Sequence, residues 1–427
     1  MTSITTQPGV PAVVYLSSML RDAVVDVDGK GIGTIADAIV RLGPTGHPHL
    51  TGLVAKVGQN RVFVPITVVS SIVPDRIILN TKTLDLRPFE RRDGEVLLKE
   101  AVLGHRVIDV EHARLVRAYD VTLTNTPTGW AATGLDVHKR SWLPGSKHDQ
   151  HTPRDWNEFD ALIGHEASVK VRTGFGRLRG LRAAEIADII ESASTRERDD
   201  LLDHLHHHPD LEADVFEELQ DTHQTQLLKT LSTPEIAAVL TRMRTDDAVD
   251  AIIDLPQDRR QPVIDALPTL KQADVMRLMR YQESSAGGLM GVEYLALGEN
   301  ATIAEVLDQV RTSTTVQPEA LSTVYSTNTD LQLTGSLSLV RAIQADPNDR
   351  LGDIADPDPV HADPRDDMID ISNIMADYNL LTLPILDGNH RILGVITVDD
   401  ALEAAIPEDW RRRARHQHAT NQEPTNT

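Results

Sequence analysis

The chain of 427 residues contains no cysteine, which excludes disulfides, thiolate metal sites and thiol nucleophiles. Aromatic residues make up only 4% of it, so its hydrophobic cores must consist mainly of Leu, Ile, Val and Ala. The longest apolar stretch, VFVPITVVSSIVPDRIIL, is interrupted by two prolines and two charged residues, and it indicates strands rather than a membrane span. The N-terminus lacks the features of a signal peptide. These absences favour a cytoplasmic globular protein without a transmembrane segment.

The net charge of -22 is concentrated in the C-terminal part of the chain. Residues 1–175 contain 20 Lys and Arg and 19 Asp and Glu, so the remaining 22 basic and 45 acidic residues carry a net charge of -23. A surface this negative repels nucleic acid and anionic lipid and attracts cations or basic partners. We therefore expect no nucleic-acid partner.

The first section consists of short β-branched runs between turn residues, which predicts an all-β structure. It also repeats, because VVDVDGKGIGTIADAIV aligns with the later VIDVEHARLVRAYDVTL. The aspartates that align are Asp26 with Asp109 and Asp37 with Asp120. We predict two small barrels, at residues 13–82 and 95–140. The pattern resembles the PRC-barrel family, whose small barrels dock other proteins.

Residues 141–180 are polar and rich in Pro and Gly, which predicts a linker. Residues 181–282 instead show short amphipathic helices, because apolar residues recur every 12 positions. The series comprises Val215, Leu227, Val239, Ala251, Val263 and Val275. Helices this short are unstable alone, so we expect them to stack into a superhelical array.

The last section alternates helical and strand patterns and contains two related α/β units, at residues 284–345 and 346–406. The tail, residues 407–427, is basic, and we expect it to be disordered. Together these sections predict a multidomain protein: all-β small barrels, an α-helical superhelical domain and an α/β pair.

The order of these sections, with the motifs TDDAVDAIIDLP, SSAGGLM and LPILDGNHRILGVITVDDALEAA, resembles the cytosolic part of MgtE-type magnesium transporters. In that family a helical N domain precedes a tandem pair of CBS domains, here CBS 1 (degenerate) and CBS 2. The resemblance covers about residues 180–406. It implies magnesium sensing and a homodimer formed through the CBS domains. The family's membrane pore has no counterpart in the sequence, so we expect a sensor without its channel.

The segment RTDDAVDAIIDLP is the first candidate metal site. Asp246 and Asp250 lie four residues apart on one helical face with Asp247 beside them, so their carboxylates repel one another. A cation would relieve this repulsion, and Mg²⁺ is commonly held by one or two carboxylates plus waters. The alternative is that the first two acids favour the helix dipole after a Thr245 cap and that Asp250 is simply solvated.

The resemblance to MgtE places further sensing acids in the CBS region. These candidates are Asp356, Asp358, Asp367, Asp400 and Glu403. The alternative is that the stretch from Asp346 to Asp370 is an ordinary solvated loop.

CBS domains of this kind often bind adenine nucleotides such as ATP through the motif G-h-h-T-x-x-D, where h is apolar. Gly394, Thr397 and Asp400 fit it, with the hydroxyl suited to phosphate and the carboxylate to ribose. The alternative is that the threonine only caps a helix. CBS 1 keeps Ser338 but has Arg341 in place of the acid, so we expect at most one nucleotide site.

Other motifs for chemistry are weak. HLHHHPD gathers His204, His206, His207 and His208, which more often form a polar helix end than a transition-metal site. No Ser-His-Asp set, HExxH motif or phosphate loop occurs, and we expect no enzyme.

We therefore predict a magnesium-sensing regulatory protein whose acidic helical domain and CBS pair close around hydrated Mg²⁺. Its barrels would dock a protein partner, with a membrane transporter as one candidate. The alternatives are a nucleotide-responsive CBS adaptor and a membrane-associated scaffold.

Overall fold

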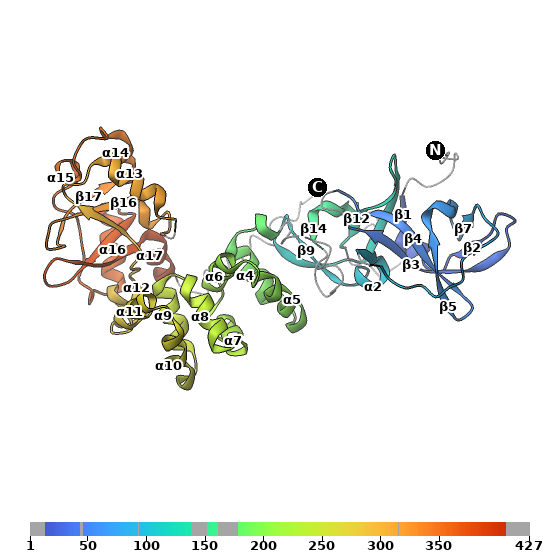
Figure 1. Ribbon diagram of the computed structural model, residues 1–427, viewed down its shortest axis with the longest axis horizontal. Coiled ribbons are helices and arrows are strands. Elements are labelled where there is room, and N and C mark those ends of the chain that lie inside the picture. The colour runs from blue at the N-terminus through green and yellow to red at the C-terminus, as the bar shows by residue number, and fades with distance from the viewer. Residues whose placement is uncertain are drawn as a thin grey trace, which may run out of the picture. The chain divides into compact units, whose positions relative to one another are not determined.

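The computed structural model (Figure 1) describes residues 13–42, 46–92, 94–138, 152–160, 178–314 and 316–406. The chain divides into two compact units, with the boundary after His208. No helix of the described part combines the length and the hydropathy that crossing a membrane requires. The predicted disordered tail, residues 407–427, lies outside the described residues.

The first unit contains two sets of strands, each of which begins with a short strand and a short helix. The first set comprises β1 (Val13–Tyr15), α1 (Leu16–Met19), β2 (Ala23–Val25), β3 (Gly31–Arg41), β4 (His49–Val57), β5 (Asn60–Pro65), η1 (Ile66–Val68), β6 (Val69–Val73) and β7 (Arg76–Leu79). The second set comprises β8 (Glu95–Leu97), α2 (Leu98–Ala101), β9 (Arg106–Asp109), β10 (Arg114–Arg117), β11 (Asp120–Thr126), β12 (Gly129–Asp136), β13 (Arg154–Asp155), η2 (Trp156–Glu158) and β14 (Phe159–Asp160).

An 11-stranded sheet connects the two sets in the order β1-β11-β12-β4-β3-β2-β7-β6, with β13 on β12, β5 on β4 and β8 on β3. The order β10-β9-β14 forms a second sheet. The first strand of each set pairs with a strand of the other set, β1 with β11 and β8 with β3. One hydrophobic cluster includes buried residues of both sets. The two predicted barrels are therefore interlocked.

The aligned aspartates stabilise this exchange of first strands between the two sets. The buried carboxylate of Asp37, in β3, accepts hydrogen bonds from the backbone N–H of Lys99 (2.7 Å) and Glu100 (3.2 Å) at the start of α2. In the mirror arrangement Asp120 of β11 accepts from the backbone N–H of Ser17 (3.0 Å) and from its hydroxyl at the start of α1. Each aspartate thus caps the short helix of the other set.

The linker prediction is wrong for residues 154–160. They form β13, η2 and β14, which pair with β12 and β9 of the second set. Arg154 donates to both oxygens of the buried Asp109 and to Glu158, which fastens this segment to the barrel. Residues 141–151 and 161–177 of the predicted linker lie outside the described part.

The predicted helical array is confirmed. Its helices are α4 (Ala183–Ser192), α5 (Thr195–Leu205), α6 (Pro209–Glu217), α7 (Asp221–Thr230), α8 (Thr233–Arg242), α9 (Thr245–Asp254), α10 (Gln257–Ala266) and α11 (Thr269–Leu278). From α7 to α11 each helix starts 12 residues after the previous one, and every residue of the predicted apolar series is buried. Alternate helices pack together, α8 on α6 and α10, and α9 on α7 and α11.

Helices α4 and α5 belong to the first unit. They are fastened to the second set of strands by Arg106 of β9, which donates to the carbonyl of Ser192 (3.0 Å) and lies 2.9 Å from the Glu197 carboxylate.

The last section contains the predicted pair of α/β units. The first comprises β15 (Leu295–Gly298), α13 (Ile303–Thr312), η4 (Ala320–Ser322), β16 (Thr323–Thr327), β17 (Leu333–Ser338), α14 (Leu339–Gln344) and α15 (Leu351–Ile354). The second comprises α16 (Met368–Tyr378), β18 (Thr382–Leu386), β19 (Ile392–Thr397) and α17 (Val398–Ala405), and the short α12 (Ala286–Leu289) packs on β19.

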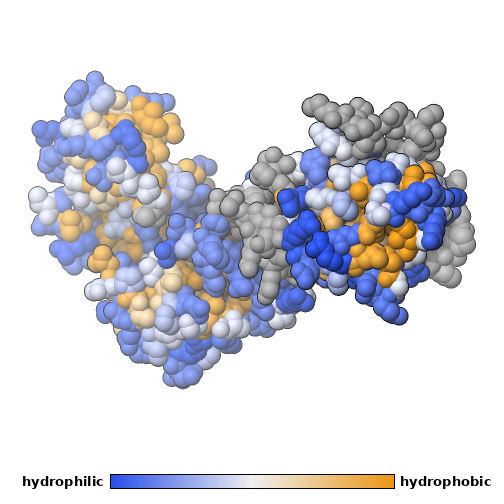
Figure 2. Space-filling model, turned by 45° about the vertical axis from the view of Figure 1, so that its right-hand side comes forward, coloured by the Kyte–Doolittle hydropathy of each residue, from blue (hydrophilic) through white to orange (hydrophobic). Residues whose placement is uncertain are grey.

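Helix α15, at the start of the second predicted unit, also contacts the core of the first. Leu351 of α15 packs into the same core as Ile303 and Val324. The hydroxyls of Tyr325 and Thr382 lie 2.8 Å apart and join the two units. Figure 2 shows a mainly hydrophilic surface with hydrophobic patches on the barrel region and on the α/β pair.

Candidate functional site

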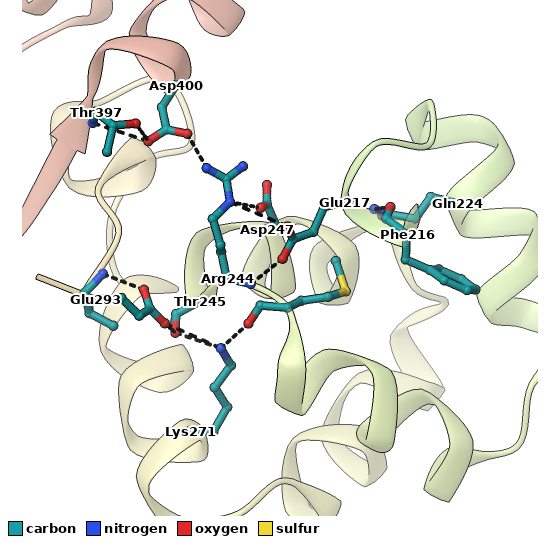
Figure 3. Close-up of polar contacts among 12 residues, drawn as sticks. Phe216, Glu217, Gln224, Arg244, Thr245, Asp247, Lys271, Glu293, Thr397 and Asp400 are labelled. Atoms are coloured by element: carbon teal, nitrogen blue, oxygen red, sulfur yellow. Dashed lines mark hydrogen bonds and ion pairs between the residues drawn. The ribbon is translucent and has the colours of Figure 1, made fainter. Parts of the chain in front are cut away.

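Acidic side chains gather where helix α9 meets the second α/β unit (Figure 3). Helix α9 begins at Thr245 after the extended Arg244, so its first turn carries Asp246 and Asp247, where acids favour the helix dipole. Asp400 reaches the same place from α17, and Glu217 reaches it from the end of α6. Residues that are up to 183 positions apart in the chain thus meet at one boundary within the second unit.

The guanidinium of Arg244 lies at the centre of this cluster (Figure 3). Its Nε donates to Asp247 Oδ2 and its Nη1 to Asp400 Oδ1, both at 2.6 Å. The Glu217 carboxylate accepts from the Arg244 backbone N–H at 2.5 Å and lies 3.8 Å from its Nε. One arginine therefore joins two helices of the array to the last helix of the chain's second α/β unit.

A second basic side chain lies on the other side of the turn. Lys271 Nζ donates to the carbonyl of Met243 (2.5 Å) and to Thr245 Oγ1 (2.9 Å) and lies 3.7 Å from Glu293 Oε1. The Thr245 hydroxyl donates to the same Glu293 oxygen at 2.6 Å. Thr245 is buried and is the first residue of the helix, so the prediction that its side chain caps α9 is wrong.

Asp246 is less well compensated, although the charge of Arg244 partly offsets its own. It is only 7% exposed, and within the described part of the chain its Oδ1 atom has no hydrogen-bond partner. A methyl group on Gly291 would lie 3.9 Å from this oxygen, 3.9 Å from the carbonyl oxygen of Val395 and 3.7 Å from Glu293 Oε2. Three oxygen atoms from separate parts of the chain therefore face one small space beside Gly291.

The cluster raises the pKa of its own acids. Burial, followed by repulsion from Asp247, raises the pKa of Asp246 well above its usual range. Burial likewise raises the pKa of Glu217 and of Asp247 to about 7, although Arg244 opposes both shifts. Asp250 is exposed, and partial loss of hydration together with Glu283 and Asp246 raises its pKa as well. Negative charge in this cluster is thus under-compensated.

Such a cluster can attract a hard cation, since carboxylate and carbonyl oxygens are the ligands that Mg²⁺ prefers. The described residues contain no group of three or more His, Asp or Glu side chains placed to hold a metal directly. Mg²⁺ commonly keeps several of its waters and is held through one or two carboxylates.

Comparison with known families identifies all three sections. Residues 181–284 match the MgtE intracellular N domain, residues 351–406 match the CBS domain, and residues 11–86 match the PRC-barrel domain. Residues 181–406 thus resemble the N domain and CBS region of MgtE magnesium transporters. The fold is that of a PRC barrel followed by an MgtE N domain and a CBS pair, as predicted from the sequence.

The relatives are magnesium transporters. The MgtE of Thermus thermophilus is 34% identical over 257 residues, which cover 53% of this chain and 56% of the transporter. The MgtE of Bacillus subtilis is 22% identical over 195 residues, covering 46% of this chain and 43% of the transporter. The chain thus spans about half the length of these relatives.

A solved structure supports the same fold. The soluble part of a magnesium transporter matches with a TM-score of 0.51 and 23% identity, covering 55% of this chain and 90% of that one. The cytosolic domain of the Mg²⁺ channel MgtE in complex with ATP matches with a TM-score of 0.44 and 30% identity, covering 53% of this chain and 96% of that one.

The predicted metal residues fall into two groups. Asp246, Asp247 and Asp400 are brought together at the boundary between the MgtE N domain and CBS 2. Asp250 is exposed one turn further along α9. The remaining acids are exposed, namely Asp356, Asp358, Asp367 and Glu403. Of these, Asp367 caps α16 by accepting from the backbone N–H of Ile369 and Asp370.

The predicted nucleotide residues already have other contacts. Thr397 caps α17 and donates its hydroxyl to Asp400 Oδ2 at 2.5 Å, while the other oxygen of Asp400 accepts from Arg244. A side chain on Gly394 would lie 2.5 Å from the carbonyl oxygen of Gly291. The segment that follows α12 therefore packs too closely on β19 for any residue but glycine at position 394. In CBS 1, Ser338 accepts from the backbone N–H of Arg341.

The sequence interpretation missed Arg244, Glu217, Glu293 and Lys271. Only Arg244 had a local signal, because it adjoins the acidic run in RTDD. In the histidine motif, His204 Nδ1 lies 2.6 Å from the carbonyl of Asp200 and His207 Nδ1 lies 2.9 Å from that of Asp203, which suits a polar helix end.

Proposed function

We propose that the protein is a magnesium-sensing regulatory protein in which hydrated Mg²⁺ stabilises the contact between the MgtE N domain and CBS 2. The observation that carries the proposal is the buried Oδ1 atom of Asp246, which has no hydrogen-bond partner among the described residues and, like Glu293 Oε2 and the Val395 carbonyl, lies within 4 Å of where a Cβ on Gly291 would stand. A buried carboxylate oxygen without a partner is costly, and a hard cation held through water would remove that cost.

The surrounding charges support this. Five acids lie at the described boundary, Glu217, Asp246, Asp247, Glu293 and Asp400, against the two bases Arg244 and Lys271. An ion that binds the closed boundary more tightly than an open one shifts the equilibrium toward closure. The similarity to MgtE magnesium transporters points to Mg²⁺ as that ion.

The other sections suggest how such a signal is used. We assign the barrels the role of docking a protein partner in the cytoplasm, with a membrane transporter as the candidate, because PRC barrels are docking modules. We also assign the CBS pair to a homodimer. In support, a groove of about 350 Å³ between α16 and α17 is lined by apolar residues such as Met375, Leu381 and Leu402, and the last two are more than half exposed.

The test is a titration of the full chain with MgCl₂ from micromolar to tens of millimolar at constant ionic strength, with the melting temperature as readout. A specific ion should give a saturable rise, because a ligand at 100 times its Kd stabilises a protein by about 2.7 kcal/mol. The double variant Asp246→Asn with Asp250→Asn should lose this rise.

The control double variant is Asp254→Asn with Asp258→Asn, which removes the same charge from two exposed aspartates and should keep the rise. If both double variants respond like the original chain, the ion binds elsewhere. A flat magnesium curve together with a rise on ATP would instead support the nucleotide-responsive CBS adaptor. If neither ligand acts and only the barrels are needed to capture a partner, the scaffold interpretation stands.

A further inference from the structure

We infer that the guanidinium of Arg244 acts as a counter-ion of the acidic cluster and holds the N domain on CBS 2. It thereby sets the Mg²⁺ concentration that is needed to close this contact. The inference rests on the proposed magnesium-sensing function and adds a regulatory residue to it. Arg244 was not among the residues that the sequence motifs indicated, and its role follows from contacts with three separate helices.

The geometry is that of a cation seated among acids. The side chain of Arg244 is 21% exposed and makes two bonds of 2.6 Å, one to Asp247 and one to Asp400, with Glu217 3.8 Å away. Arginine stays charged under all ordinary conditions, and its planar fork bonds two carboxylates at once, which a lysine cannot match. The contact between residues 244 and 400 therefore exists without any metal.

The same contacts divide the acidic cluster into two parts. Asp247 and Asp400 accept hydrogen bonds from Arg244, whereas Asp246 keeps a buried oxygen without a hydrogen-bond partner among the described residues. A divalent ion near Asp246 would meet the repulsion of the fixed guanidinium, because both positive charges lie in one poorly hydrated cluster. Arg244 thus stabilises the metal-free contact and weakens the response to the ion.

The experiment compares the full chain with Arg244→Gln, Arg244→Lys and Arg242→Gln in the same magnesium titration. Arg242 is a matched control, because it lies two residues away and contacts only exposed groups, the Asp210 carboxylate and the Ala238 carbonyl, among the described residues. A second readout is hydrogen exchange of the α17 amides without metal, which reports opening of the contact directly.

Without Mg²⁺, Arg244→Gln should lower the melting temperature and speed exchange in α17, while Arg242→Gln should change neither. With Mg²⁺, the midpoint for Arg244→Gln should fall by about tenfold, because the competing charge is gone. Arg244→Lys keeps the charge and should keep a midpoint near that of the original chain, even if its weaker bonding lowers the metal-free melting temperature.

The outcomes separate this inference from the proposed function. If the original chain responds to Mg²⁺ and Arg244→Gln responds with the same midpoint, Arg244 is not a counter-ion but the sensor stands. If Arg244→Lys behaves like Arg244→Gln, packing rather than charge explains the effect, and the inference fails. If no protein in the set responds to Mg²⁺, both proposals fall. A response that emerges only in Arg244→Gln would support the inference most strongly.

Discussion

At the scale of single residues, the boundary between the N domain and CBS 2 has fewer basic than acidic side chains. Arg244 and Lys271 are the bases in contact with the cluster in the described part of the chain. Burial, with repulsion between neighbouring acids, raises the pKa values of Glu217 and Asp247, so both hold protons more tightly than usual. A proton and a magnesium ion should therefore relieve the same repulsion.

This competition predicts a pH-dependent magnesium response. The pKa values of Glu217 and Asp247 are raised to about 7 in the folded chain, above those of the unfolded chain. The stability they contribute is therefore present at acidic pH and is lost as pH rises toward and through 7. The rise in melting temperature on adding Mg²⁺ should be small at pH 5.5 and larger at pH 8. An equal rise in melting temperature at both pH values would contradict the idea that a proton and Mg²⁺ relieve the same repulsion.

A second prediction concerns Gly291. A methyl group here would meet only ordinary contacts of 3.7 to 3.9 Å, so Gly291→Ala should fold and melt within about 1 kcal/mol of the original chain. It would nevertheless fill the space between Asp246 Oδ1, Glu293 Oε2 and the Val395 carbonyl. We expect at least a severalfold loss of magnesium affinity in the titration. Gly298→Ala, where a methyl group meets no atom within 4 Å, is the matched control.

At the scale of elements, the barrel region depends on exchange between its two sets of strands. The first strand and helix of each set dock on the other set, and Asp37 and Asp120 cap the helices that arrive. The aligned aspartates were visible as a sequence repeat, but the repeat alone did not say that each acid serves the other copy.

The exchange predicts equal effects of two distant substitutions. Asp37→Ala and Asp120→Ala should each destabilise the barrel region by about 2 kcal/mol, because each leaves helix N–H groups without an acceptor. The exposed Asp28→Ala, which loses only a surface pair with Lys82, should cost less than about 0.5 kcal/mol. Denaturant unfolding followed by the tryptophans measures all three. Strongly unequal effects of the two capping acids would count against the exchange as a stabilising device.

At the scale of the whole molecule, the chain joins a PRC-barrel region, an acidic helical array and a CBS pair. The apolar groove between α16 and α17 is the surface on which a second copy is expected. Several apolar side chains of the CBS pair are strongly exposed. They include Val340, Ile343, Ile369, Leu381 and Leu402.

We therefore predict that Leu402→Asp converts a dimer into a monomer, because a charge in the centre of an apolar interface is desolvated without a partner. The measurement is light scattering coupled to size-exclusion chromatography. Leu270→Asp is the control, since Leu270 is 82% exposed on α11, outside the groove. A chain that is monomeric before substitution, or dimeric after it, would contradict the assignment of this face.

The sequence by itself determined the parts of the protein that depend on local patterns. The 12-residue period specifies α7 to α11, because each short helix repeats the same apolar spacing and buries it against its neighbours. The strand patterns and the motif around Thr397 likewise indicate the barrels and the CBS pair.

Only the tertiary structure decided which acids share a site. Arg244 and Asp400 are 156 residues apart, and no local pattern relates them. The same holds for residues 154–160, whose polar composition indicated a linker until pairing with β12 and β9 placed them in the barrel. Electrostatic contacts and strand pairing depend on where the chain returns in space, whereas helical periodicity depends on neighbours a few residues away.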